Sequence, residues 1–157
     1  QVHFEHFDLR SVIQSIVNSS DILFRQKEVT LSYHPDEEPI MVWADEYMIE
    51  EVVSNYVSNA LNHVKYENKI EIKTIRKGDH VCTSVFNTGD PIPEEDMDKI
   101  WSKFYKVDKA RTREYGGNGI GLSIVKAVMD AHNQKFGVKN YDNGVEFWFE
   151  LDVKSVD

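Results

Sequence analysis

Hydrophobic residues recur along the chain at two different spacings, and these spacings predict its helices and strands. Apolar residues follow a helical spacing in three stretches, residues 7–24, 46–64 and 119–132. Asp8 and Asp45 stand near the start of the first two stretches, where a carboxylate can accept hydrogen bonds from the free N–H groups of the first helical turn. We therefore expect three amphipathic helices, two of them capped by aspartate.

Short runs of alternating apolar residues predict strands at residues 29–34, 70–75, 80–86, 136–141 and 145–151, and a further short apolar run lies at residues 40–44. Residues 77–79 (Lys-Gly-Asp) and 142–144 (Asp-Asn-Gly) predict tight turns, and Asn-Gly is a strong hairpin signal. Helices and strands do not alternate strictly. The expected fold class is therefore α+β, with one sheet and helices on one face.

Length and charge narrow the classes of protein that this sequence can represent. A chain of 157 residues fits a single domain, and its net charge of −9 argues against nucleic acid as the main partner. No apolar run approaches the roughly 18 residues of a membrane helix, so we expect no membrane contact by this segment. Cys82, the single cysteine, excludes an internal disulfide, fits a reducing, cytoplasmic compartment and is expected to be a small core residue. The start at Gln1, without an initiator Met or signal pattern, is typical of a fragment.

Three asparagines share one face of the predicted helix 46–64. Asn55, Asn59 and Asn62 follow i, i+4, i+7 spacing, while the opposite face is apolar. A solvated helix face favours Glu, Lys and Gln, whereas Asn is a poor helix former, so the stripe indicates a polar wall beside a ligand. An amide oxygen is a hard, neutral ligand that suits magnesium, and magnesium in turn binds substrate phosphates.

A glycine-rich stretch, residues 116–122, leads directly into the last predicted helix. Glycines at the start of a helix allow backbone N–H groups to close around phosphate oxygens. The stretch has no Gly-Lys-Ser/Thr ending and does not match G-x-G-x-x-G, so it is neither a Walker A loop nor a dinucleotide fingerprint. The whole segment 87–119 is long, irregular and rich in Gly, Pro and charge, which is typical of a functional or disordered segment.

Four segments, taken in order, resemble the catalytic ATP-binding domain of sensor histidine kinases, a member of the Bergerat-type ATPase superfamily. EVVSNYVSNALNHV resembles the N box, VFNTGDPIP the first glycine box, IWSKFYKVDKAR the F box and GGNGIGLSIVK the second glycine box. The resemblance spans nearly the whole chain. It implies a Bergerat fold over residues 1–157, a two-layer sandwich with a mixed, mostly antiparallel sheet, and a flexible ATP lid at about 102–117.

The resemblance also implies roles for individual residues. Asn55 and Asn59 correspond to catalytic N-box positions, and Asn59 to the magnesium ligand. Phe104 corresponds to the aromatic that packs the lid. The implied nucleotide-binding positions are Asn62, His63, Asn87, Gly89, Pro91, Ile92, Lys106, Arg111, Gly117, Gly119, Gly121 and Leu122.

The implied function is that of a protein histidine kinase. Such a domain binds ATP or ADP with magnesium and gives the γ-phosphate to a histidine on the acceptor-histidine dimerisation domain of the same parent protein, with a response regulator downstream. None of the six histidines lies in the acceptor signature of the family. We therefore expect that the acceptor domain is absent, that this fragment does not phosphorylate itself, and that its parent is a membrane-anchored sensor.

Three positions depart from the family pattern. Asn87 replaces the aspartate that accepts a hydrogen bond from the adenine amino group; an amide oxygen can accept the same bond if its NH₂ turns away. Pro91 replaces the second glycine of its box and stiffens that loop. Asn62 replaces a lysine and removes one positive charge near the phosphates.

Two alternatives remain open at this point. An anti-sigma-factor-type serine kinase shares the superfamily, but that family carries Glu where this chain has Asn55 and lacks an F box. An ATP-hydrolysing clamp also needs a general-base Glu at this position, and Asn cannot serve as that base. The second alternative, a non-catalytic nucleotide-binding or interaction module, is motivated by Asn62, Asn87 and Pro91.

Overall fold

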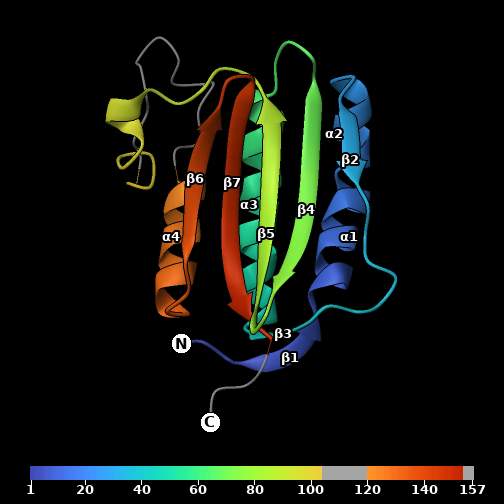
Figure 1. Cartoon of the computed structure of the whole chain (residues 1–157), viewed down its shortest axis with the longest axis vertical. Helices are drawn as coiled ribbons and strands as arrows, with labels where there is room; N and C mark the ends of the chain where they lie inside the picture. Colours follow the sequence, from blue (N-terminus) through green and yellow to red (C-terminus); the bar gives the residue numbers. More distant parts are fainter. Residues whose placement is uncertain (104–119, 154–157) are drawn as a thin grey trace.

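A mixed sheet forms one layer of the molecule, and helices cover one of its faces (Figure 1). The computed structural model describes residues 1–103 and 120–153. Within this part of the chain seven strands form the sheet: β1 (Glu5–Asp8), β2 (Thr30–Tyr33), β3 (Met41–Ala44), β4 (Lys69–Lys77), β5 (His80–Thr88), β6 (Phe136–Tyr141) and β7 (Gly144–Asp152). The helices are α1 (Leu9–Ser19), α2 (Asp21–Gln26), α3 (Glu46–His63) and α4 (Gly121–Ala131), with a 3₁₀ turn at Glu94–Asp96.

Strand pairing is antiparallel throughout this sheet except at one edge. The order is β1-β3-β7-β5-β4-β2, and β6 pairs with β7. Only β2 and β4 run parallel. The expected α+β class, with a mostly antiparallel sheet and helices on one face, is confirmed.

Both predicted aspartate caps are present, but the first helix differs from its prediction. Asp8 accepts from the N–H of Arg10 at 3.0 Å, and Asp45 accepts from the N–H of Met48 at 3.1 Å. The chain up to Asp8 forms β1, because it pairs with β3 instead of starting the helix. The predicted single helix is also divided at Ser20, which ends α1 and precedes α2.

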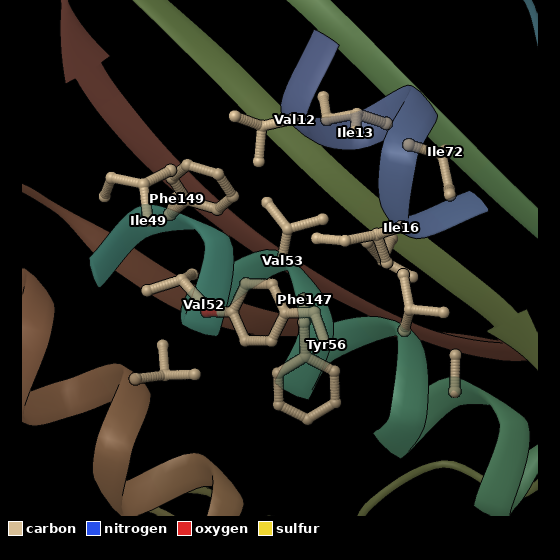
Figure 2. Packing of buried hydrophobic residues seen from close by; sticks show 14 of the residues in the cluster. Val12, Ile13, Ile16, Ile49, Val52, Val53, Tyr56, Ile72, Phe147 and Phe149 are labelled. Atoms are coloured by element: carbon tan, nitrogen blue, oxygen red, sulfur yellow. The ribbon is translucent and has the colours of Figure 1, made fainter. Parts of the chain in front are cut away.

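The core lies between the helices and the inward side chains of the sheet (Figure 2). Tyr56 of α3 is its centre: its ring lies 5.4 Å from Phe147 and 6.1 Å from Phe149, measured between centroids. Its hydroxyl donates to the carbonyl oxygen of Trp148 at 3.0 Å, so the buried polar atom is paired. Burial raises the pKa of Tyr56 well above its ordinary value. This apolar face of α3 fixes the direction of the opposite, asparagine-bearing face.

Cys82 does not join this core, contrary to the expectation from its strand. It is half-buried and lies beside Lys73 and Trp148 on the outer face of the sheet, because side chains alternate along β5. Partial burial raises the pKa of its thiol. Among the helices described, none is long and apolar enough to span a bilayer.

Candidate functional site

Asn59 is the most unusual polar residue of the described chain. It lies on α3, it is only 4% exposed, and neither its Oδ1 nor its Nδ2 has a hydrogen-bond partner among the described residues. Leaving a buried polar group unpaired costs about 1–3 kcal/mol, so most buried amides are paired. Both side-chain polar atoms of Asn59 are therefore available to bind a group that lies outside the described residues.

The second asparagine brings α3 and α4 together. Asn55 donates from Nδ2 to the carbonyl oxygen of Glu51 at 2.8 Å, which leaves its Oδ1 pointing away from its own helix. A Cβ added at Gly121 would lie 2.8 Å from that Oδ1. Any other residue at position 121 would require the amide of Asn55 to shift, so glycine lets the first turn of α4 approach Asn55 this closely. The first N–H groups of any helix have no carbonyl partner within it, so this approach places a candidate anion site beside the asparagines.

The end of β5 forms the next part of the site. Asn87 is 2% exposed, and its Nδ2 donates to the carbonyl oxygen of Thr88 at 3.1 Å. The amide oxygen of Asn87 is therefore the atom left to accept a bond from a ligand. Gly89 has φ +154°, and a Cβ there would lie 2.7 Å from the carbonyl oxygen of His63. This close approach joins the exit of β5 to the end of α3.

The chain after Gly89 is held by residues from two other segments. Asp90 accepts from the hydroxyl of Tyr66 at 2.5 Å and lies 3.4 Å from Nζ of Lys65. Ile92 is 2% exposed, and its backbone is hydrogen-bonded to the side chain of Asn140 on β6. Asn140 is not among the site residues predicted from the sequence; the available signal was a polar residue at an inward position of a predicted strand.

His63, at the last position of α3, is a neutral group. Burial, together with repulsion from Lys65 and Lys27, lowers its pKa to about 3. It therefore carries no positive charge near pH 7. Any contact with a ligand phosphate or ribose would be a hydrogen bond from a neutral imidazole, and not an ion pair. Asn62, one residue earlier, is exposed.

The structure brings some predicted site residues together and leaves others outside its description. Close approaches join Asn55 to Gly121, and Gly89 to His63 and Asn87, while Asn59 lies on α3 one turn after Asn55. Leu122 and Ile92 are buried, whereas Pro91 is exposed. Most of the predicted lid lies outside the described residues, with Phe104, Lys106, Arg111, Gly117 and Gly119.

The side chains available as ligands determine which metal ion could bind at this site. Residues 1–103 and 120–153 contain no group of three or more His, Cys, Asp or Glu side chains that could hold an ion. A cage built by protein carboxylates is thus not formed by these residues. Magnesium fits the orphaned amide of Asn59, because this ion commonly binds through one or two protein oxygens and completes its shell with waters and substrate phosphates.

Comparison with known proteins agrees with this fold. Residues 44–155 match the family of histidine kinase-, DNA gyrase B- and HSP90-like ATPases, and the chain belongs to this family. The sensor protein kinase WalK of Staphylococcus haemolyticus is 29% identical over 160 residues, which cover 100% of this chain and 26% of WalK. The chain thus spans about a quarter of the length of this curated relative.

Solved structures of histidine kinases share the fold. The nucleotide-free catalytic domain of histidine kinase ThkA is 34% identical, with a TM-score of 0.83, and the match covers 96% of this chain and 95% of that one. ThkA in complex with the response regulator protein TrrA is similar at 31% identity and a TM-score of 0.82, covering 98% of this chain and 42% of that one. Fold and family together define a catalytic domain of the sensor histidine kinase type.

Proposed function

We propose that this domain binds ATP or ADP with magnesium and donates the γ-phosphate to a histidine on a separate acceptor domain of its parent sensor kinase. The observation that carries the proposal is Asn59, a buried amide with two unpaired atoms on a helix face next to a glycine-led helix start. Family membership supports ATP as the ligand. The proposed location of the domain is the cytoplasmic side of a membrane-anchored parent.

Different described residues would bind the magnesium ion and the phosphates of the nucleotide. Asn59 would ligate magnesium through Oδ1, and bound magnesium would neutralise charge on the phosphate oxygens. Asn55 would orient the phosphates from one turn earlier, opposite the N-terminal N–H groups of α4. Phosphoryl transfer needs mainly positioning and charge stabilisation, which these neutral donors and acceptors can supply.

Asn87 would accept the exocyclic amino group of adenine. Its NH₂ donates to the carbonyl oxygen of Thr88, which presents the amide oxygen as the remaining acceptor. In this orientation the amide oxygen of Asn87 can accept the hydrogen bond that the aspartate of the family accepts. A neutral acceptor makes a weaker bond than a carboxylate, but it also avoids the cost of burying a charge.

The absence of a base at position 55 favours transfer over hydrolysis. Asn55 cannot take a proton from water, and its Nδ2 is already bonded to Glu51. An acceptor histidine supplies its own nucleophilic nitrogen and needs no water activation. The proposed partners are therefore the acceptor-histidine dimerisation domain and, downstream, a response regulator, in line with the ThkA–TrrA complex.

A transfer assay tests this proposal. The domain is mixed with γ-labelled ATP, magnesium and the acceptor-histidine domain of its parent, and labelled acceptor is measured; the acceptor with its histidine changed to glutamine is the control. We expect label on the acceptor histidine only, and none on this chain alone. Nucleotide binding without any transfer would instead identify a non-catalytic module, and no nucleotide binding would overturn the proposal.

A further inference from the structure

The side chain of Asn140 holds the backbone of Ile92 at two points. Its Oδ1 accepts from the N–H of Ile92 at 2.9 Å, and its Nδ2 donates to the carbonyl oxygen of the same residue at 2.7 Å. Nδ2 also lies 3.7 Å from Sδ of Met97. Only an amide of this length offers one acceptor and one donor in this arrangement.

Asn140 holds the one residue between two prolines that can donate a backbone hydrogen bond. Pro91 and Pro93 have no N–H, so Ile92 carries the only backbone donor between residues 91 and 93. Asn140 binds this one donor and the carbonyl oxygen beside it. Ile92 is 2% exposed, so its side chain is packed inside the protein. The bonds from Asn140 to its backbone therefore help to set where this side chain lies.

Strand register connects Asn140 to Asn87. Val145 of β7 pairs with Asn87 of β5 on one side and with Asn140 of β6 on the other. Side chains that pair across strands point to the same face, and two strand spacings separate their backbones by roughly 10 Å. Asn87 and Asn140 therefore lie in one row across the sheet, on the face that Asn87 and Val145 bury.

We propose that Asn140 is a positioning residue for the nucleotide base, which keeps Ile92 as an apolar wall at a fixed separation from the base-accepting amide of Asn87. This inference rests on the proposed function and adds a determinant of base affinity and base preference. Asn140 would act through Ile92, to whose backbone it is bonded, and not by contacting the nucleotide itself. The phosphate end of the site, at Asn59 and Gly121, is held by other elements.

Two variants of Asn140 separate this role from a general effect on folding. Asn140→Leu removes both bonds, while Asn140→Asp keeps the volume and the acceptor but loses the donor to the carbonyl oxygen of Ile92. Asn133→Asp is a matched control, because it adds the same charge at an exposed position just after the C-terminal end of α4. Each protein is titrated with ADP and GDP in magnesium, and its transfer rate is measured at saturating ATP.

We expect both Asn140 variants to bind ADP about tenfold more weakly, the equivalent of ~1.4 kcal/mol. The preference for ADP over GDP should fall as well, while the transfer rate at saturating ATP changes less than about twofold, since only base positioning is lost. Asn133→Asp should match the unmutated protein. The inference is overturned if both Asn140 variants lower the melting temperature but leave ADP affinity and base preference within about twofold of the unmutated protein. If the unmutated protein binds no nucleotide, the proposed function fails first, and the two failures are distinct.

Discussion

Buried polar groups are hydrogen-bonded to one another at the start of α3, whereas on its asparagine face the buried amide of Asn59 is unpaired among the described residues. At the start, the carboxylate of Asp45 accepts from the N–H of His3 at 2.9 Å and of Met48 at 3.1 Å. The N–H of Asp45 donates to Nε2 of buried His132 at 3.0 Å, and Nδ1 of His132 lies 2.8 Å from the carbonyl oxygen of Val128. Fourteen residues after Asp45, the buried amide of Asn59 has no partner in the described chain.

This contrast separates a polar cluster that is fully hydrogen-bonded from the amide that we propose binds a ligand. Nε2 of His132 accepts from the N–H of Asp45 while Nδ1 lies beside the carbonyl oxygen of Val128, so the cluster ties the N-terminal segment and α4 to the start of α3. Burial opposes ionisation of Asp45, but the bonds from His3 and Met48 outweigh it, so the pKa of Asp45 is lowered. Such complete pairing stabilises the fold, whereas the unpaired amide of Asn59 lowers stability and remains available to a ligand.

The largest expected effect is at the unpaired amide. Asn59→Ala should weaken ATP binding in magnesium at least ~100-fold, the equivalent of ~2.7 kcal/mol, because the proposed metal ligand is lost. The free energy of unfolding without nucleotide should stay the same or rise, because an unpaired buried amide is removed. Calorimetry and urea denaturation measure the two quantities. A stability loss comparable to the affinity loss would show that Asn59 is a structural residue.

The paired cluster should respond in the opposite sense. Asp45→Ala should lower the free energy of unfolding by about 2–3 kcal/mol, because α3 loses its cap and the bond from His3 is lost. Asp98→Ala, at an exposed aspartate, is the control and should change it by less than about 0.5 kcal/mol. Urea denaturation measures both variants. Equal stability of the two would contradict the assignment of Asp45 as a structural residue.

Acid should destabilise the protein through His63. Its pKa is lowered from 6.5 to about 3 in the fold, so below pH 6.5 the unfolded chain binds a proton that the folded chain excludes. Stability should therefore fall as the pH decreases from 6.5 toward 3. Between pH 7 and 5, above the range where Asp8 and Asp45 titrate, the loss should be about 1–2 kcal/mol.

A variant isolates this contribution. His63→Gln should show a shallower fall in unfolding free energy over the same pH window, whereas His34→Gln, at an exposed histidine, should follow the unmutated protein. Denaturation at several pH values between 7 and 5 provides the comparison. If His63→Gln has the same pH slope as the unmutated protein, His63 is not held neutral by burial.

The smallest expected effect concerns an unpaired hydroxyl away from the site. Thr83 is fully buried, and its Oγ1 has no partner among the described residues. Thr83→Val should raise the unfolding free energy by about 1 kcal/mol, without any effect on nucleotide binding. Thr88→Val is the matched control, because Oγ1 of Thr88 accepts from the N–H of Lys69 at 3.0 Å, and it should destabilise. A stability loss in Thr83→Val would point to a partner of this hydroxyl, such as a bound water.

Much of the fold was predictable from the sequence because it depends on local signals. The caps at Asp8 and Asp45 and the Asn-Gly hairpin follow from side-chain chemistry within a few residues. β1 was missed because its pairing partner, β3, lies more than thirty residues away. The division at Ser20 has no strong local signal such as Gly or Pro.

The candidate site was only partly predictable for the same reason. Helical spacing placed Asn59 and Asn62 on one face, but Asn59 is 4% exposed and Asn62 is exposed, because spacing does not say what covers a face. The role of Asn140 depends on a contact with Ile92 across 48 residues, which no local pattern contains. The roles expected of Lys106 and Arg111 lie outside the described residues and stay predictions.

The central claim is that the orphaned amide of Asn59 is kept for a magnesium-bound nucleotide. Calorimetric titration of the unmutated domain with ATP, once in magnesium and once in excess chelator, tests it most directly. We expect an affinity at least ~100-fold higher in magnesium, the equivalent of ~2.7 kcal/mol. Equal affinity in the two buffers would contradict it.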